Sequence, residues 1–488
     1  MPTLNALLPC LWAIFPLLAC NGPDPKQGDP GPGQAGTAEA GSPVAQEAET
    51  SKASPELPRG KQLDFGTPPK VPTGPLSEEA RAAVETAFGD NLEVWSWEEE
   101  QLDALGVLLD SEDIRLTWIF TDLIRVSRDP QLSNLLALIA SELMGPDFTF
   151  DEDWGEITDH LIAWDIPAPP NYIEVKRRIY TPLVPQWERI IQPGDIDWRL
   201  VTWGGVRIDD RAYDTTDEPC SCIPAADNPE VQPASEATWL KDSDVIFGIV
   251  IGDAARAYPR QIMEVREMVN DTLGGRDLAI PYCTLCASAQ AYYTDQLPEG
   301  VARPILRTSG LLIRSNKVMY DVNTFSVFDT FLGNAVTGPL AEKKVTLPQA
   351  GVITTTWGAW KAAHPETDVL IEDLALGRDF DFRNGRDANG PIFPVGDVDD
   401  RLALQEDVLG ILTASGKPIA FHVNSAIAAL KRGEEVAFEN VRVILDAGGV
   451  RAVDAEGEDL GGHQAFWFAW SQFHPGTNLW PTAMAKDQ

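Results

Sequence analysis

The sequence IPYCTLCAS at residues 280–288 contains the one C-x-x-C motif of the chain, formed by Cys283 and Cys286. The turn sequence NDTLGG at residues 270–275 precedes it, and the two glycines there can adopt positive φ. The apolar residues 278–280 that follow predict a buried strand leading to Cys283. Because the residues after Cys286 also favour a strand, we expect no helix N-terminus to lower the pKa of either thiol.

Upstream of this motif, VIFGIVIG at residues 245–252 and AYP at residues 257–259 predict a hairpin whose first strand is buried on both faces. Part of this pattern returns later, as VLGIL at residues 408–412 followed by Ala420 and Phe421. The pattern W-x-x-W-x-x-x-H-P-x-T occurs at residues 357–367 and again at 467–477. Each copy predicts a short helix that turns two Trp to the core and ends before proline. These two repeated patterns predict a partial internal duplication.

The residues before this β-rich region have a helical period. Asp129 and Pro130 predict a capped helix start, and Gly145 predicts its end. Four Trp between residues 154 and 198 predict an interface with the region that follows. The predicted class is α+β, with an all-α helical module followed by a β-rich α+β domain. The expected divisions are a signal peptide at 1–19, a disordered Pro/Gly/Ala-rich linker at 20–75, the helical module at 76–200 and the β-rich domain at 201–488.

The N-terminal residues have the pattern of an export signal. Residues 7–19 form an apolar run that is too short to span a bilayer. Its end, LLAC at residues 17–20, resembles the lipobox of bacterial lipoproteins, which implies lipidation at Cys20 and a membrane partner through that anchor. Asn21 implies the outer membrane or cell surface by the same resemblance. The Lys or Arg usual before such a run is missing, so an uncleaved anchor and simple secretion are the alternatives.

The composition excludes one large class of partner. The chain has 488 residues and a formal net charge of −36, so nucleic-acid phosphates would be repelled rather than neutralised. A basic membrane-binding patch is excluded on the same ground, and we interpret the acidity as a source of solubility. The linker residues are poor in large apolar side chains and predict a flexible tether.

Four cysteines remain after Cys10 and Cys20 are set aside, namely Cys220, Cys222, Cys283 and Cys286. Export implies an oxidising compartment, where disulfides persist. The C-x-x-C pair is compatible with thiol redox chemistry, a structural disulfide or a soft metal. Because neighbouring cysteines at spacing C-x-C bridge with strain, we expect Cys220 and Cys222 to pair with Cys283 and Cys286. A four-sulfur cage for zinc or copper(I) is the alternative.

The histidines are weaker candidates for a functional site than the cysteines. His364 and His474 precede proline at predicted helix ends, where they can bond the last carbonyls or, alternatively, bind a metal. The other histidines, His160, His422 and His463, show no ligand spacing. No phosphate-binding loop and no Ser nucleophile elbow is found, so the cofactor is left open.

Several of these segments together resemble a bacterial family of undefined activity, domain-of-unknown-function family 3179. The resemblance extends over about residues 223–480. The matching segments are AYP at 257–259, VND at 269–271, Gly-Gly at 274–275, YCTLCA at 282–287, VMYD at 318–321, GPL at 338–340 and both W-x-x-W-x-x-x-H-P segments.

Some relatives are understood to carry selenocysteine within the C-x-x-C, which implies redox turnover at this motif. The chain departs from the family pattern at Thr284 and Ala287, at Arg266 where relatives often have His, and in its extra C-x-C pair. The leading hypothesis is thiol redox chemistry in which one of Cys283 and Cys286 attacks and the other resolves. A soft-metal binding protein and a non-catalytic surface binding module with structural disulfides are the alternatives.

Overall fold

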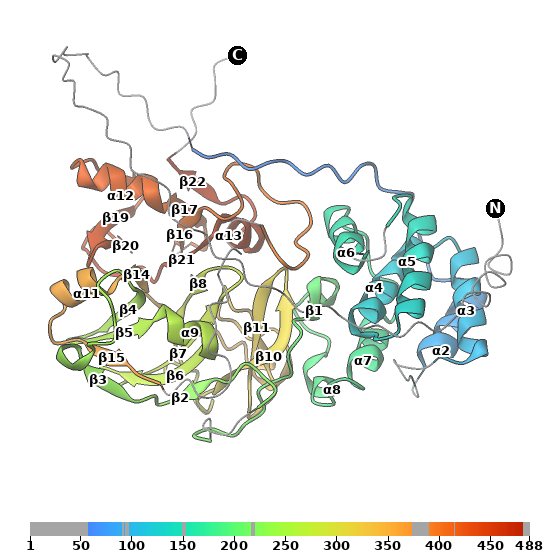
Figure 1. Cartoon of the computed structure of the whole chain (residues 1–488), viewed down its shortest axis with the longest axis horizontal. Helices are drawn as coiled ribbons and strands as arrows, with labels where there is room; N and C mark the ends of the chain where they lie inside the picture. Colours follow the sequence, from blue (N-terminus) through green and yellow to red (C-terminus); the bar gives the residue numbers. More distant parts are fainter. Residues whose placement is uncertain are drawn as a thin grey trace, which may run out of the picture. The chain divides into compact units, whose positions relative to one another are not determined.

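Helices occupy residues 78–190 and regular strands begin at Val201 in the computed structural model (Figure 1). The structure describes residues 57–89, 92, 97–148, 153–215, 220–372, 390–413 and 415–481. These residues all belong to one of the two units into which the chain divides, residues 55–488. The expected signal peptide, Cys20 and most of the expected linker lie outside the described residues.

The helical part contains α2 (Glu78–Phe88), α3 (Glu99–Asp110), α4 (Thr117–Val126), α5 (Pro130–Met144), α6 (Asp153–Ala163), α7 (Tyr172–Tyr180) and α8 (Trp187–Ile190), with 3-10 turns η1 (Ile114–Leu116) and η2 (Trp198–Leu200). Helix α5 has the predicted ends: the Asp129 carboxylate accepts the Gln131 N–H at 2.9 Å, Pro130 is its first residue, and Gly145 ends it at φ 97°. Within the described residues, no helix is both long enough and apolar enough to cross a membrane.

The helical part and the β-rich part share one apolar core. Val201, Leu311 and Val318 of the β-rich part are buried in the same cluster as the helix side chains. The Trp187 indole N–H donates to the Ser309 carbonyl at 2.8 Å. Trp187 therefore lies at the interface that the tryptophan-rich sequence predicts.

The β-rich part forms five sheets within the described residues. Their strands, in spatial order, are β1 (Val201–Trp203), β10 (Leu306–Ile313), β11 (Asn316–Asp321) and β12 (Val327–Phe328); β13 (Gln349–Ala350), β9 (Ala291–Tyr293), β7 (Arg276–Cys283), β6 (Met268–Leu273) and β2 (Ala226–Asp227), with β8 (Ser288–Ala289) on β7; β14 (Ile353–Thr356), β4 (Val245–Ile251), β5 (Ala254–Pro259), β15 (Asp368–Leu370) and β3 (Val231–Pro233); β21 (His463–Phe466), β16 (Asp407–Leu412), β17 (Pro418–His422) and β22 (Asn478–Trp480); and β18 (Val436–Phe438), β19 (Val441–Asp446) and β20 (Gly449–Val453).

Short helices connect these strands. They are η3 (Ala234–Glu236), α9 (Arg260–Arg266), α10 (Gly338–Glu342), α11 (Trp357–Ala363), α12 (Val423–Lys431) and α13 (Trp467–Phe473). The α+β class, with N-terminal helices and a β-rich C-terminal part, is confirmed. The hairpin expected from residue 245 is β4 paired with β5, although Val250 is 42% exposed, so β4 is not buried on both faces throughout.

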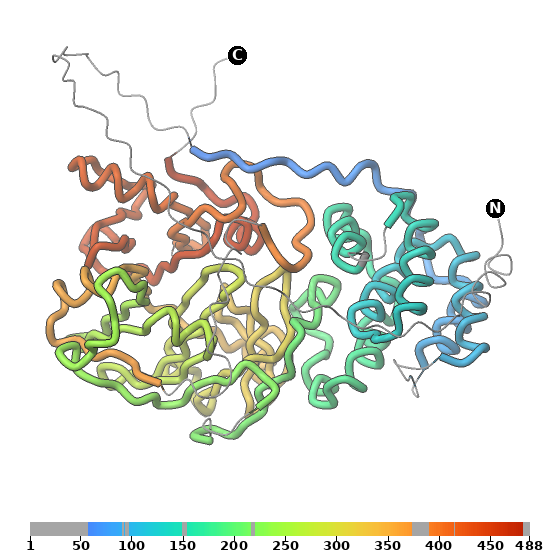
Figure 2. The backbone as a smooth tube through the Cα atoms, in the orientation of Figure 1, coloured from blue at the N-terminus to red at the C-terminus, as the bar shows by residue number. Residues whose placement is uncertain are grey.

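Two of the sheets have the same internal order. Strands β14-β4-β5-β15 correspond to β21-β16-β17-β22, with the last pair parallel and the others antiparallel in both sheets. Helix α9 follows the first hairpin and α12 follows the second. Figure 2 shows the two chain stretches in different colours, green to orange and orange to red. We refer to them below as the first sheet unit and the second sheet unit.

The start of the described chain contacts the second sheet unit. Residues 57–75 have no helix or strand. Even so, the Gly60 N–H donates to the Asp400 carbonyl at 3.0 Å, and the Ala403 N–H donates to the Pro58 carbonyl at 2.7 Å. Leu57 is buried in the same cluster as Trp467. This end of the expected linker is therefore held against the β-rich part (Figure 2).

Candidate functional site

Cys283 is the last residue of strand β7, and strand β8 returns immediately beside it. Tyr282 pairs with Ala289 and Cys283 pairs with Ser288. The intervening residues 284–287 form a tight loop in which Ala287 has φ 50° and the Cys286 N–H donates to the Cys283 carbonyl at 3.2 Å. The C-x-x-C motif therefore lies in a β-hairpin, and no helix begins at it.

Both thiols of the motif are free and buried. Cys283 is 2% exposed and Cys286 is 0% exposed. The two Sγ atoms donate to one acceptor, the Ser315 carbonyl, at 3.8 Å from Cys283 and 3.3 Å from Cys286. Ser315 lies in the turn between β10 and β11, so a distant hairpin brings the two sulfurs to a common point.

A buried ion pair lies beside the thiols. Lys317, on β11, places its Nζ 3.1 Å from the Glu267 carboxylate. The same Nζ donates to the Tyr282 carbonyl at 2.5 Å and to the Glu267 carbonyl. The Thr284 hydroxyl, inside the C-x-x-C loop, donates to the Glu267 carboxylate at 2.9 Å. Sequence reasoning did not find Lys317 or Glu267; the one available signal was that Lys317 directly precedes the VMYD segment.

These neighbours shift the pKa values of the two thiols in opposite directions. Burial raises the pKa of Cys283, as does the Glu267 charge, but the Cys286 hydrogen bond and the charge and backbone N–H of Lys317 bring it below the ordinary value. Burial, the hydrogen bond to Cys283 and the negative charges of Cys283 and Glu267 raise the pKa of Cys286 well above the ordinary value. Cys283 is therefore the thiol that ionises first, and Cys286 keeps its proton.

A cavity of about 160 Å³ opens onto Cys283 and does not include Cys286 in its wall. Glu267, Lys317 and Thr284 line it together with the bulged part of β10, residues 308–312. Gly310 in that bulge has φ 77°, and a Cβ there would lie 2.5 Å from the Val206 carbonyl oxygen, so the bulge depends on glycine. Of the two thiols, only that of Cys283 is therefore reached from the cavity.

The second cysteine pair differs from the expectation. Cys220 and Cys222 form a disulfide with each other, so the prediction that they pair with Cys283 and Cys286 is wrong. The loop that holds this disulfide is tied to Arg207 by a parallel bridge to Cys222 and by the Arg207 N–H, which donates to the Ser221 carbonyl at 3.1 Å. The strain expected from the C-x-C spacing therefore does not prevent this disulfide.

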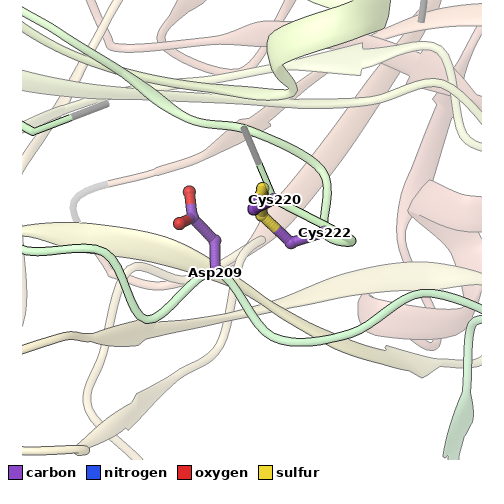
Figure 3. Close-up of side chains that lie close together, drawn as sticks. All are labelled: Asp209, Cys220 and Cys222. Carbon is purple, nitrogen blue, oxygen red and sulfur yellow. A yellow bond between two sulfur atoms is a disulfide. The ribbon is translucent and has the colours of Figure 1, made fainter. Parts of the chain in front are cut away.

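The four sulfurs do not form one cage. Among the described residues, the one group of three or more His, Cys, Asp or Glu ligand atoms within 4.8 Å of one another is Asp209 with Cys220 and Cys222 (Figure 3). The buried Asp209 carboxylate already accepts from Arg211 Nε at 2.7 Å and from the Ala225 N–H at 2.9 Å. A metal at this point would need the disulfide reduced and would compete with Arg211 for Asp209.

The two histidines of the repeated Trp motif have a different role from the expected one. The backbone N–H of each caps its helix, to the carbonyl of Trp360 or Trp470. The imidazole rings pack at a tilt against the same Trp rings, with centroids 4.2 Å apart for His364 and 4.0 Å for His474. The Nε2 atoms of both have no hydrogen-bond partner within the described residues. These side chains do not bond the last carbonyls.

Other residues of the family pattern form the scaffold of the site. The Tyr258 hydroxyl donates to Asp271 at 2.7 Å, and Arg256 donates to the same carboxylate. The Asn270 amide donates to the Leu306 carbonyl at 3.1 Å, which joins β6 to β10. Arg266, present where relatives often have His, is buried and forms an ion pair with Glu372. These contacts fix the strands around the thiols and do not reach the cavity.

The fold and the site define a β-rich domain that presents a free dithiol hairpin beside a buried Lys–Glu pair. The family model described as "Protein of unknown function (DUF3179)" matches residues 220–462. Over these residues the chain belongs to the DUF3179 family, as the resemblance implied. No curated protein and no solved structure matches the chain.

Proposed function

We propose that the protein is a thiol–disulfide oxidoreductase in which Cys283 attacks the substrate and Cys286 resolves the intermediate. The main support for this proposal is that the two thiols differ. Cys283 has a lowered pKa and lines the cavity, whereas Cys286 has a raised pKa and is fully buried. The thiolate is the nucleophile in exchange, so this asymmetry supports an order of attack.

The proposed reaction transfers two electrons to the substrate. The Cys283 thiolate attacks one sulfur of a substrate disulfide, forms a mixed disulfide and releases the other sulfur as a thiolate. Cys286 then loses its proton and attacks Cys283 Sγ, which releases the second substrate thiol after protonation. The Cys283–Cys286 disulfide that remains is returned to the dithiol by two external thiol groups, which are oxidised to a disulfide.

A trapping experiment tests this order. In Cys286→Ser protein, a small disulfide should leave a stable mixed disulfide on Cys283, seen by mass spectrometry of the intact protein and its peptides. In Cys283→Ser protein, the same treatment should leave Cys286 unmodified. Equal labelling of both single variants would reject the assigned roles. Failure of folded wild-type protein to react at either thiol would leave the non-catalytic binding module as the better description.

The pH dependence of alkylation tests the electrostatic origin of the nucleophile. Lys317→Met should raise the pKa of Cys283 and move its iodoacetamide alkylation profile to higher pH, because the nearby positive charge is lost. Glu267→Gln should move the profile to lower pH, because Glu267 raises the pKa of Cys283. Lys361→Met, which removes an exposed ion pair with Asp242, is the charge-matched control. Shifts of the same sign in the two variants would contradict this account.

We also propose that the protein is exported and lipid-anchored to the cell envelope through Cys20, at the outer membrane or cell surface. The support is the apolar run at residues 7–19 and the LLAC sequence that ends it. Metabolic labelling with a fatty acid should mark the wild-type chain and not the Cys20→Ala variant. Equal labelling of the two chains, or no labelling of either, would reject lipidation at Cys20.

A second candidate function is binding of a soft metal, and the juxtaposition of Asp209 with Cys220 and Cys222 favours it. After mild reduction, metal analysis should find zinc or copper(I) that Cys220→Ser removes and Cys283→Ser leaves. We propose further that the two sheet units arose by partial duplication, which their equal strand order and repeated Trp motif support.

A further inference from the structure

Arg125, on α4, is surrounded by aromatic rings. Its guanidinium carbon lies 4.6 Å from the ring centre of Trp154, 5.3 Å from that of Trp203 and 5.4 Å from that of Phe393. Its Nε donates to the Trp203 carbonyl at 2.8 Å. The rings hold the guanidinium in one orientation, and stacking of this kind leaves the planar fork free to bind an anion.

Among the described residues, no carboxylate forms an ion pair with Arg125, whereas Arg115 and Arg199 of the same helical part pair with Asp113 and Asp197. Burial lowers the pKa of Arg125 accordingly. A partly buried cation to which the described residues supply no counter-charge is costly, and it is unexpected in a chain with 74 acidic and 38 basic residues.

Arg125 does not line the Cys283 cavity itself but contacts residues of its wall or next to it. Phe393 contributes to the wall of the cavity and also stacks against the guanidinium. Gly204 lines the same cavity, and a Cβ placed on the next residue, Gly205, would lie 3.7 Å from Arg125 Nη2. A molecule with its sulfur at Cys283 that extends past Phe393 would therefore approach Arg125.

We propose that the substrate of Cys283 is a small disulfide with an acidic group, a carboxylate or sulfonate, that Arg125 binds. This inference rests on the proposed function and adds the substrate class. A protein disulfide does not fit, because Cys283 is only 2% exposed and the cavity of about 160 Å³ is smaller than the roughly 300–1,000 Å³ of drug-sized ligand sites. Guanidinium binds carboxylates bidentately, which fixes one end of such a molecule.

The net charge of the protein makes the proposal sharply testable. A chain at −36 repels anions at long range, so by net charge alone the thiol should react faster with cationic disulfides. A preference for an anionic disulfide would have to come from the site. Raising the ionic strength should weaken the long-range repulsion more than the contact at Arg125, because buried pairs are screened less.

Three disulfides of similar size serve as probes: dithiodipropionate, which is anionic, dithiodiethanol, which is neutral, and cystamine, which is cationic. The rate of mixed-disulfide formation is measured in Cys286→Ser protein at one pH and ionic strength. Dithiodipropionate should react faster than dithiodiethanol by about tenfold or more, the effect of one charge-assisted contact. Adding Arg125→Gln should remove this advantage, with cystamine then the fastest, and Arg125→Lys should restore part of it.

Two controls keep the outcome clear. Arg178→Gln removes a partly buried arginine of the same helical part that pairs with Glu85 and Glu174, and it should leave the probe order unchanged. Should Arg125→Gln fail to fold, glutarate must still slow the reaction of the neutral probe with unsubstituted Arg125 protein, whereas chloride at equal ionic strength must not. Faster reaction with cystamine, or an anion preference that survives Arg125→Gln, overturns the proposal. Absence of reaction with all three probes instead overturns the proposed function itself.

Discussion

The first and second sheet units have nearly the same framework and differ in what is added to it. In both, a glycine of a central strand faces a Trp of the motif helix: Gly248 of β4 faces Trp360 of α11, and Gly410 of β16 faces Trp470 of α13. In both, that Trp donates its indole N–H to a threonine hydroxyl at 3.0 Å, Thr367 in the first and Thr477 in the second. The repeated sequence motif is therefore a packing device.

The difference lies in the chain between the hairpin and the final strands of each unit. In the first unit this segment extends β7 to Cys283 and continues through β8 to β13 before reaching β14. In the second unit β20 ends at Val453 and β21 begins at His463. The dithiol thus belongs to an addition that the second unit lacks, and the shared framework carries no thiol of its own.

The second unit nevertheless completes the site. The Phe466 N–H donates to the Cys286 carbonyl at 2.9 Å, and Trp467 and Trp470 are buried in one cluster with both thiols. The corresponding Trp357 and Trp360 belong to another cluster. Two equivalent helices therefore have unequal importance for the chemistry, and substitutions can separate the two contributions.

The largest expected effect comes from removing the buried Trp of each unit. Trp360→Ala and Trp470→Ala should each lower the free energy of unfolding by about 3–5 kcal/mol, because each leaves a large cavity. Only Trp470→Ala should also speed alkylation of Cys283 and Cys286, since only Trp470 packs in their cluster. Urea unfolding and timed iodoacetamide labelling measure the two effects.

Trp118→Ala is a matched control, because Trp118 is equally buried but lies in the core of the helical part. It should cost a similar free energy of unfolding and leave the thiol rates unchanged. Faster thiol labelling in all three variants would mean that loss of stability alone exposes the cysteines, and the distinction between the two units would fail.

How much of this the sequence predicts depends on whether the signal is local. The α5 ends at Asp129 and Gly145, the turn at Gly274 and Gly275, and the two Trp helices follow from spacing and turn chemistry, and the structure has each of them. The resemblance to the family followed from ordered motifs and is confirmed over residues 220–462.

The electrostatics of the site has no such local signal. Lys317 and Glu267 are fifty residues apart and meet because β11 passes the end of α9. The Ser315 carbonyl accepts from both thiols, but nothing in the sequence distinguishes Ser315 from other turn residues. The direct Cys220–Cys222 bridge is not predicted, because the expectation rested on the strain of the C-x-C spacing alone. These contacts depend on which strands lie beside one another in space, and a single sequence does not show that arrangement.

The next largest effect is expected on stability at acid pH. It concerns one position at which the two sheet units have different residues. His463 of β21 pairs with Gly410, whereas its counterpart Ile353 of β14 pairs with Gly248. Burial, with the nearby His474, lowers the pKa of His463 to about 3, and burial lowers that of His474 to about 4. The unfolded chain therefore binds more protons below pH 6.5, so stability falls as the pH falls from there toward 3.

His463→Ile gives the second unit the residue of the first. It should reduce the loss of unfolding free energy between pH 7 and pH 4 by roughly 3 kcal/mol relative to wild type, by linkage. At pH 7 the variant should be less stable, because Gln349 and Gln290 lose the ring nitrogens 2.8 Å and 3.3 Å away. Urea midpoints at several pH values measure both. Parallel pH curves for the two proteins would reject a buried neutral His463.

A smaller effect is expected at the glycines that face the two Trp rings. A Cβ at Gly248 would lie 2.2 Å from Trp360 Cζ3, and one at Gly410 would lie 2.1 Å from Trp470 Cε3. Gly248→Ala and Gly410→Ala should each cost about 1–3 kcal/mol through overpacking. Gly252→Ser, at a turn where a Cβ meets nothing within 4 Å, reports the separate cost of positive φ. A neutral Gly248→Ala beside a costly Gly410→Ala would show that the two frameworks are not equally tight.

The smallest effect is expected at the threonines that accept the indole N–H groups. Thr477→Val leaves the Trp470 N–H without its acceptor and should cost about 1 kcal/mol. Thr367→Val should cost somewhat more, because the Thr367 hydroxyl also contacts the Ala255 carbonyl at 3.0 Å, which ties β15 to β5. Unfolding of each variant and of the matched Thr→Ser proteins measures the difference, since serine keeps the hydroxyl. An equal cost for the two valine variants would mean that the extra bond adds no stability, and the two units would then be energetically alike wherever their sequences agree.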